Sequence, residues 1–204
     1  MKTFFTPGRI WPTNRRLTHI YYLPDTNTLA PLLDAYAPTL QGLDFLTPVP
    51  PEWLHATLLK ITTPMDAFEA ATEEVLLARL RAELATVSPL SLLAGPALAG
   101  ASAVVLDLTP DHHWNTLCAR IATAIDDVLG PGTAMIKQQE RPHITLAYGI
   151  ADGDSGEVQS RLRRATDQRV PLQLDRLHLV DVIQDLAASG YRWTPRATLD
   201  LRPT

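Results

Sequence analysis

The sequence predicts a mixed α and β fold built from two related halves, and three observations support this. Two apolar runs with strand character carry the same pattern, His-x-Thr-Leu, which begins at His55 in one run and at His143 in the other. A Pro-Asp pair precedes each run, and the aspartates Asp25 and Asp111 lie 30 and 32 residues before these histidines. In both halves an amphipathic helix pattern lies between the aspartate and the histidine. Each half therefore reads as a β-α-β-α unit, and we expect an approximate two-fold axis to relate the two histidines.

The composition is that of an ordinary soluble globular protein. The chain has 204 residues, of which 46% are hydrophobic and 20% charged, enough for one sizeable domain or two tightly joined lobes. A net charge of −4 disfavours generic binding to long nucleic acid, but it leaves room for a small anionic ligand or a strand end in a local pocket. The single cysteine, Cys118, excludes an intramolecular disulfide and a thiolate zinc cluster, and we expect it in the core.

Residues 1–16 are expected to form an irregular arm. Pro7 and Pro12 interrupt this segment, so it lacks the continuous apolar region of a signal peptide. No stretch of about 18 consecutive apolar residues is present, so no transmembrane helix and no membrane contact are expected. These features predict a cytoplasmic location. The arm is expected to pack through Phe4, Phe5 and Trp11.

The first half is expected to begin with a β-rich run at 17–23. A helix follows, because leucines recur at helical spacing between a capping Asp25 and a terminating Gly42. The remaining segments are a proline-rich loop at 45–51, the first motif strand at 53–61, and a helix that opens at Thr63-Pro64 and runs to about Ala85.

The second half is expected to follow two strands, at 90–93 and 101–108, that are separated by a turn region at Gly95-Pro96 and Gly100. A helix with a clean apolar stripe then opens at Asp111 and ends at Gly130. The remaining segments are the second motif strand at 140–150, a shorter helix from the Asp152–Ser155 turn to Asp167, and two long strands at 170–184 and 191–201 joined by a hairpin at 187–190.

Each motif places an imidazole and a hydroxyl side by side. In a strand, residues i and i+2 share a face, so His55 lies beside Thr57, and His143 beside Thr145, with backbones roughly 6–7 Å apart. By the same alternation Lys60 falls on the opposite face from His55, which predicts no direct catalytic role for it. The intervening residues, expected to face a core, are Ala56, Leu58, Ile144 and Leu146.

The chemistry that suits two such pairs is metal-free hydrolysis of a phosphodiester, particularly a cyclic one. Histidine gains and loses a proton near neutral pH, so one imidazole can take a proton from water while the other gives one to the departing oxygen. The two threonine hydroxyls can donate hydrogen bonds to the non-bridging phosphate oxygens. A lone strand histidine would more often be structural, but a repeated motif favours a site made by both.

On these residues the sequence resembles the 2H phosphoesterases, and within them the bacterial 2′-5′ RNA ligase and RNA 2′,3′-cyclic phosphodiesterase group. The likeness covers about 17–201, with anchors at the two motifs, at Arg141-Pro142 and at Tyr191-Arg192-Trp193. It implies a bilobal α+β fold with a pseudo-two-fold axis, in which two antiparallel sheets line a central cleft and helices lie outside. The expected organisation is an arm at 1–16 and a single domain at 17–204, with pseudo-repeats at about 17–100 and 101–204.

The resemblance also implies a hydrolase that opens 2′,3′-cyclic phosphates on RNA ends or small nucleotides. No metal and no other cofactor is expected, and reversible 2′-5′ RNA ligation and a place in RNA processing belong to the same family. The family pattern makes His143 the base and His55 the acid, although the pseudo-symmetry allows the reverse. The expected partner is a nucleotide or RNA terminus bearing a cyclic phosphate, bound by a monomer.

Three alternatives stay open at this point. Low basicity and the arm at 1–16 depart from the RNA-ligating members, so ADP-ribose cyclic phosphate is as good a substrate candidate as an RNA end. Cyclic oligonucleotide signals would need a wider cleft. A non-catalytic module that binds nucleotides or RNA ends is the third, and the presence of both complete motifs argues against it.

Other polar and aromatic residues are weaker candidates. Arg141 is a candidate contact for the substrate phosphate, or an exposed strand-end residue. Tyr191 and Trp193 share a strand face, where they either stack on a base or pack in the core. The adjacent His112-His113 lacks the ligand spacing of a metal site, so surface positions are expected. His19 lies in the first strand, where it is a candidate for lining the cleft, and His178 lies in a later one. Neither has a threonine at i+2, and both are read as structural.

Overall fold

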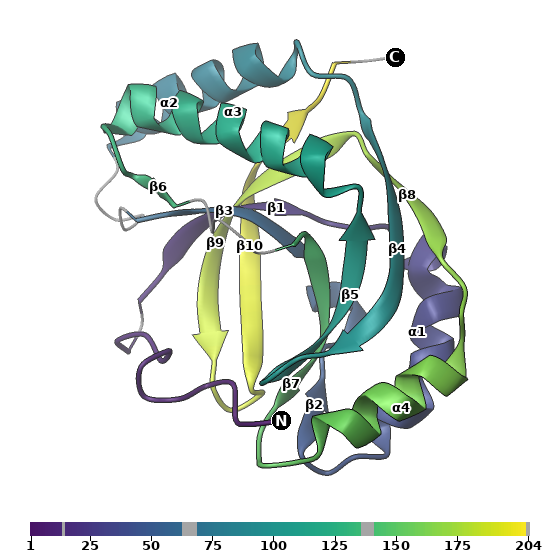
Figure 1. Cartoon of the computed structure of the whole chain (residues 1–204). Helices are drawn as coiled ribbons and strands as arrows, with labels where there is room; N and C mark the ends of the chain where they lie inside the picture. Colours follow the sequence, from purple (N-terminus) through teal and green to yellow (C-terminus); the bar gives the residue numbers. More distant parts are fainter. Residues whose placement is uncertain (14, 63–68, 136–140, 203–204) are drawn as a thin grey trace.

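The computed structural model describes residues 1–13, 15–62, 69–135 and 141–202. It confirms an α+β fold in which two antiparallel five-stranded sheets face each other and helices cover their outer sides (Figure 1). In chain order the elements are β1 (Leu17–Tyr22), α1 (Thr26–Gln41), β2 (Leu46–Pro48), the 3-10 helix η1 (Pro51–Trp53), β3 (Ala56–Ile61), α2 (Ala70–Leu84), β4 (Leu90–Ala99), β5 (Ala103–Thr109), α3 (Asp111–Leu129), β6 (Ala134–Met135), β7 (His143–Gly149), α4 (Ser155–Ala165), β8 (Val170–Leu174), β9 (Arg176–Asp185) and β10 (Gly190–Asp200).

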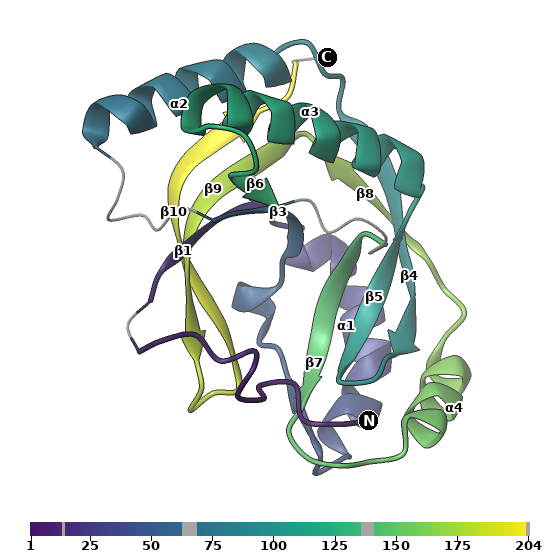
Figure 2. The ribbon, with the colours of Figure 1, turned by 60° about the vertical axis from the view of Figure 1, so that its left-hand side comes forward.

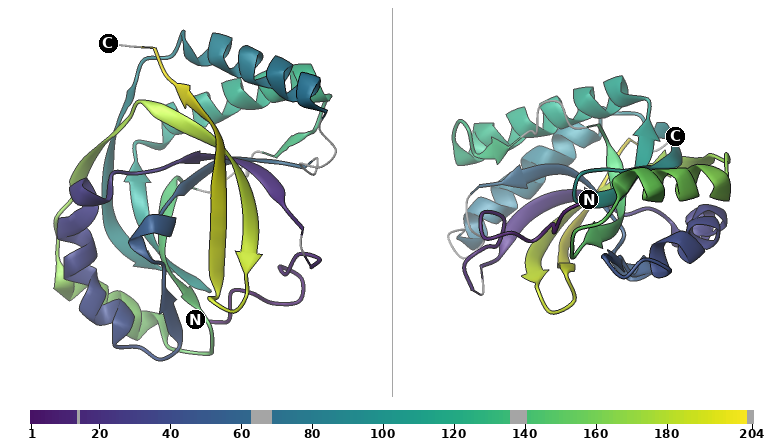
Figure 3. Two further views of the ribbon diagram at one scale, coloured as in Figure 1. Left: turned by 180° about the vertical axis from the view of Figure 1, so that it is seen from behind. Right: turned by 60° about the horizontal axis from the view of Figure 1, so that its bottom comes forward.

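Each sheet takes strands from both halves of the chain. The first sheet has the order β10-β9-β1-β3-β6, and the second has the order β2-β7-β5-β4-β8. Helices α2 and α3 pack on the first sheet, while α1 and α4 pack on the second, as Figures 2 and 3 show from other sides. Three neighbouring strands correspond in the two sheets, β6-β3-β1 in the first and β2-β7-β5 in the second. In each set the motif strand lies between a short edge strand and an inner strand. The two motif strands thus hold equivalent places in facing sheets.

The helix caps expected from the sequence are present. The Asp25 side chain accepts hydrogen bonds from the first backbone amides of α1, and Asp154 does the same for α4. Each such cap stabilises a helix by about 1 kcal/mol because it satisfies amides that the helix leaves unpaired. The expected opening of α2 at Thr63-Pro64 and the expected start of the second motif strand at Glu140 lie outside the described residues.

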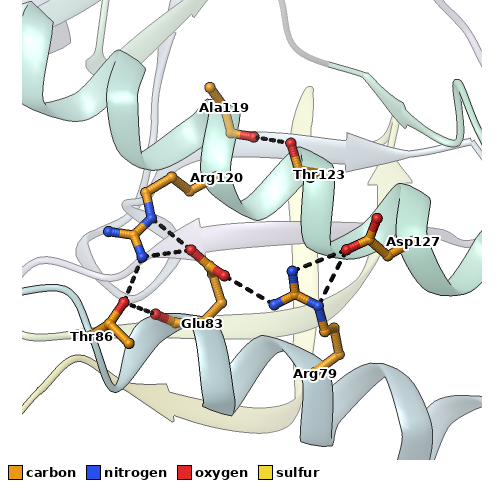
Figure 4. A network of polar contacts seen from close by, with 7 residues as sticks. All are labelled: Arg79, Glu83, Thr86, Ala119, Arg120, Thr123 and Asp127. Carbon is orange, nitrogen blue, oxygen red and sulfur yellow. Dashed lines mark hydrogen bonds and ion pairs between the residues drawn. The ribbon is translucent and has the colours of Figure 1, made fainter.

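A polar network fastens α2 to α3 above the first sheet (Figure 4). Glu83 of α2 accepts from Arg79, at 3.0 Å, and from Arg120 of α3, at 2.6 Å. Arg79 also reaches Asp127 of α3 at 3.0 Å. Hydrogen bonds from Arg79 and then from Arg120 lower the pKa of Glu83, so the carboxylate stays ionised. The network fixes the position of α3, which covers the back of β3.

Two expected boundaries are wrong, and each has a backbone cause. Gly95-Pro96 was expected in a turn, but it lies inside the ten-residue β4, where the register to β5 shifts between Ala94 and Ala97. Gly95 has φ +114°, which a bulge accepts and most side chains would not. The expected loop at 45–51 also contains β2, a short edge strand that pairs with β7.

The expected single strand at 170–184 is two strands that belong to different sheets. β8 pairs with β4 in the second sheet, whereas β9 pairs with β1 and β10 in the first. The chain crosses at Asp175, and both segments have the alternating leucines that made them look continuous. Among the described residues, no helix is long and apolar enough to cross a membrane.

Candidate active site

The motif residues lie together in one cleft of about 490 Å³ between the sheets. Strands β3 and β7 contact each other, and this brings the two motifs to opposite walls. The candidate site residues from the sequence prediction that line the cleft are His55, Thr57, His143, Thr145, Arg141 and Tyr191, and His19 also lies in the lining. Trp193 is not among them.

A β-bulge at the leucine of each motif shapes the cleft walls. In β3 the register to β1 skips Leu58, and in β7 the register to β5 skips Leu146. Both leucines are buried, so they anchor the motifs to the core as expected. Beyond each bulge the side-chain alternation reverses. For that reason Lys60 and Tyr148 line the cleft, and the expectation that Lys60 faces away from the histidines is wrong.

Both imidazoles are oriented in the same way. The His55 Nδ1 lies 2.9 Å from the carbonyl oxygen of Trp53, and the His143 Nδ1 lies 2.8 Å from that of Arg141. Because a carbonyl oxygen can only accept, each Nδ1 carries the proton of the neutral ring and each Nε2 is left as its acceptor. Each histidine therefore offers an Nε2 for proton transfer.

A buried tyrosine hydroxyl is hydrogen bonded to each motif threonine. Tyr21 of β1 is bonded to Thr57, and Tyr148 of β7 is bonded to Thr145. Burial raises the pKa of both phenols, so both stay protonated. Tyr21 also stacks on the His55 ring, with centroids 4.1 Å apart and an interplanar angle of 14°. The two tyrosines reach the threonines from different places, since Tyr21 lies opposite Thr57 on the neighbouring strand and Tyr148 follows Thr145 on the motif strand itself.

The environment of His55 holds its ring neutral at pH 7. Burial is the main cause that lowers the pKa of His55 to about 4, and positive charge on His143 and Lys60 lowers it further. The hydrogen bond to Trp53 opposes this shift. Because the charge of His143 contributes to the lowered pKa of His55, the two rings lie close enough to interact electrostatically.

Comparison with known families agrees with this geometry. The family model of the 2′-5′ RNA ligase superfamily matches residues 30–185, well over half of the chain. The chain belongs to this superfamily. The resemblance to 2H phosphoesterases that the two motifs indicated is thereby confirmed, and no curated protein matches the sequence closely enough to add to it.

Solved structures share the superfamily fold at low sequence identity. TT0787 of Thermus thermophilus is 17% identical, with a TM-score of 0.68 over 91% of this chain and 98% of that chain. E. coli LigT complexed with 3′-AMP is 15% identical, with a TM-score of 0.67 over 93% and 100%. The PDE domain of MHV ns2 is 11% identical, with a TM-score of 0.55 over 88% and 99%. At these identities the likeness establishes the fold alone.

In this superfamily member, Arg141 is held by two carboxylates. Its guanidinium lies 3.1 Å from Asp107 and 3.2 Å from Asp111. Asp107 is the cross-strand neighbour of His143, and its burial raises the pKa of the carboxyl while Arg141 opposes that rise. Arg141 thus neutralises a buried acid, and its carbonyl orients His143. Sequence reasoning named the residue but not this arrangement.

The two aromatic candidates have different surroundings. Tyr191 lines the cleft and contacts Trp11 of the arm and Tyr148, with ring centroids 5.6 and 5.9 Å apart. Trp193 packs against Trp53 and Tyr21, at 5.5 and 6.5 Å, behind the His55 side of the cleft. Trp193 therefore supports the wall of the cleft and is not placed to contact a substrate there.

The cleft is electropositive although the whole chain is acidic. Among the described residues, its lining holds the cationic side chains of Arg9, Lys60 and Arg141 and no aspartate or glutamate, and since Asp107 and Asp111 pair with Arg141, the excess of positive charge comes from Arg9 and Lys60. The chain as a whole has a net charge of −4. A locally positive, partly enclosed site attracts an anion much more strongly than the net charge suggests. Sequence reasoning missed Tyr21 and Arg9, because neither lies in a motif.

Proposed function

We propose that this protein is a metal-independent phosphodiesterase that opens 2′,3′-cyclic phosphates of nucleotides or RNA ends. The observation that carries the proposal is the matched pair of imidazoles, each with Nδ1 bonded to a carbonyl oxygen, in a cleft that also holds both motif threonines. Such a pair supplies one base and one acid around a single phosphate.

In the proposed reaction His55 is the base and His143 the acid. The neutral His55 Nε2 takes a proton from water, and the water oxygen forms a bond to phosphorus. The bond from phosphorus to one ribose oxygen breaks, and the protonated His143 gives its proton to that oxygen. The lowered pKa of His55 supports this order, which reverses the roles that the family resemblance implied. Each proton transfer contributes about 10²–10⁴-fold to the rate.

The threonines stabilise the charge that builds on the phosphate. The hydroxyls of Thr57 and Thr145 donate to the non-bridging oxygens, where negative charge increases in the transition state. The same residues would support 2′-5′ ligation if a ribose hydroxyl attacked in place of water. Structures of E. coli LigT complexed with 3′-AMP, ATP and NADP+ support a nucleotide as the ligand class.

The first test is turnover of 2′,3′-cyclic AMP in excess chelator by wild-type protein and by His55→Ala and His143→Ala variants. Wild-type turnover should persist, and each substitution should lower kcat/KM at least about 10²-fold. His112→Ala is the matched control, because that side chain is exposed and outside the cleft. Activity of either motif variant within a few-fold of wild type would refute the two-histidine mechanism.

The second test identifies the substrate among related cyclic phosphates. Initial rates are compared for 2′,3′-cyclic mononucleotides, ADP-ribose cyclic phosphate, 2′-5′ dinucleotides and cyclic oligonucleotides, with a binding titration in parallel. Tight binding without turnover of any of them would favour a non-catalytic nucleotide-binding module. The position of the phosphate in the product gives the direction of ring opening.

A further inference from the structure

The N-terminal arm forms one end of the cleft and joins the two sheets. Near its start, the Lys2 amide donates to the Ala101 carbonyl and the Phe4 amide to the Gly149 carbonyl, both at 2.7 Å, on the second sheet side. Further along, Gln184 of β9 in the first sheet binds the arm's backbone. In Figure 2 the arm runs from below β7 across the open side of the molecule to β1.

One glutamine side chain holds the far part of the arm. The Gln184 Nε2 donates to the Arg9 carbonyl at 2.8 Å, and the Trp11 amide donates to the Gln184 Oε1 at 2.7 Å. The same Nε2 lies 3.3 Å from the Tyr191 hydroxyl. These hydrogen bonds of Gln184 position Arg9 and Trp11 beside Tyr191, and all three residues line the cleft.

The Arg9 guanidinium is preorganised and keeps donors to spare. Its Nη1 donates to the Ser102 Oγ at 2.9 Å and to the Phe4 carbonyl at 3.5 Å, and the guanidinium carbon lies 4.8 Å from the centre of the Phe4 ring. In the part of the chain that the structure describes, no carboxylate pairs with Arg9. Its contacts use Nη1, which leaves the Nε and Nη2 donors in the geometry that suits a phosphate.

We propose that Arg9 binds a second phosphate of the nucleotide whose cyclic phosphate lies between His55 and His143. This inference rests on the proposed function and names the substrate class more closely: a nucleotide with a phosphate on the 5′ side of its ribose. A cleft of about 490 Å³ suits a single nucleotide. Arg9 is the cationic residue at the arm end, and Tyr191 and Trp11 provide an aromatic wall beside it.

The decisive measurement is calorimetric binding of adenosine 2′-phosphate and adenosine 2′,5′-bisphosphate, repeated with the two 3′ isomers. Wild-type protein should bind the bisphosphate at least about tenfold more tightly than the corresponding monophosphate, which is a typical effect for a charge-assisted hydrogen bond to a phosphate. Arg9→Met should remove that preference, and Arg9→Lys should retain part of it. Arg15→Met, an exposed arginine outside the cleft lining, is the matched control and should behave as wild type.

Two outcomes would overturn the inference. One is the absence of a bisphosphate preference in wild-type protein, and the other is an equal preference in wild type and Arg9→Met. If Arg9 only pinned the arm, Arg9→Met would weaken both ligands alike and leave the ratio of their affinities unchanged. Thermal unfolding of each variant shows whether the arm's loss of contacts has changed the fold as well.

Turnover separates this inference from the proposed function. Arg9→Met should raise KM for 5′-phosphorylated 2′,3′-cyclic AMP at least about tenfold more than KM for unphosphorylated 2′,3′-cyclic AMP, with kcat little changed for either. A dinucleotide with a 2′,3′-cyclic end has its internucleotide phosphate on the 5′ side of the terminal ribose. If Arg9→Met raises KM for this dinucleotide as much as for 5′-phosphorylated 2′,3′-cyclic AMP, RNA ends belong to the ligand class. If KM for the dinucleotide does not change, the ligand class is mononucleotides. If wild-type protein turns over none of these, the proposed function fails, and the calorimetric ratio still decides the role of Arg9.

Discussion

The tyrosine hydroxyls decide where the motif threonines can direct their protons. A hydroxyl group can accept one hydrogen bond while it donates another. A tyrosine that donates to its threonine leaves the threonine's own proton for the phosphate; for Tyr21, whose hydroxyl also lies 2.9 Å from the His19 Nδ1, this requires that His19 carries its proton on Nδ1 and donates to Tyr21. The tyrosines are positioning residues in this account, and their effect should appear in kcat because charge on the phosphate grows in the transition state.

Tyr21→Phe and Tyr148→Phe should each lower kcat about fivefold with little change in KM. A lost hydrogen bond of about 1 kcal/mol gives that factor, and phenylalanine keeps the ring stacked on His55. Once Thr57→Ala is present, Tyr21→Phe should have no further effect on kcat, because the partner is gone. Additive losses in that double variant would show that Tyr21 does not act through Thr57. Tyr36→Phe, a buried tyrosine bonded to the Ala97 amide outside the cleft, is the control for general destabilisation.

The pH profile should report the unusual ionisation of His55. Its pKa in the free protein is lowered to about 4, so the ring is neutral above that pH and competent as a base. The kcat/KM should therefore fall as the pH drops through about 4, where His55 becomes protonated and can no longer act as the base. Initial rates at low substrate concentration from pH 3.5 to 8 measure this. A decline in kcat/KM that already begins near pH 6 would show that the pKa of His55 is not lowered in this way.

At the scale of elements, local chemistry was predictable and the crossing of strands between sheets was not. Asp25 could be assigned as a cap, and the Asp152–Ser155 turn as the start of a helix, because a cap depends on a few neighbouring residues. The motif faces could be assigned because alternation along a strand is local, and this succeeded for His55 with Thr57 and His143 with Thr145. Alternation failed at Lys60, because a bulge depends on the partner strand, which a single sequence does not identify.

The same limit explains the other errors at this scale. Gly95-Pro96 has the composition of a turn, yet partners on both sides, β5 and β8, keep the segment within β4. The alternating leucines of 170–184 gave no sign of the crossing at Asp175, because both sheets bury one face against the same kind of core. Arg9 could not be placed in the site for a related reason: the arm reaches the cleft through contacts with residues more than ninety positions away, such as Ser102 and Gln184.

At the scale of the whole molecule, the site exists only when strands from both halves are assembled. Short strand β2, from the first half, pairs with motif strand β7, and short strand β6, from the second, pairs with motif strand β3. Helices are exchanged in the same sense, since α1 packs against α4 and α3 against α2. We infer that the two pseudo-repeats are not separate folding units, although the internal repeat itself remains an inference from the sequence and the matched strand order.

This exchange predicts a single cooperative unfolding transition. Separating one half of the chain from the other would leave β3 without β6 and β7 without β2, and it would break the arm's contacts to Ala101, Gly149 and Gln184, so a half-folded state exposes core from both sides. Urea unfolding followed by far-ultraviolet circular dichroism and by tryptophan fluorescence should give coincident midpoints. Gln184→Leu should lower the shared midpoint without separating the two curves, because the contacts of the arm stabilise a single cooperative folding unit. Two resolved transitions in wild-type protein would mean that each lobe folds alone, and that the catalytic pairs meet only by docking of finished lobes.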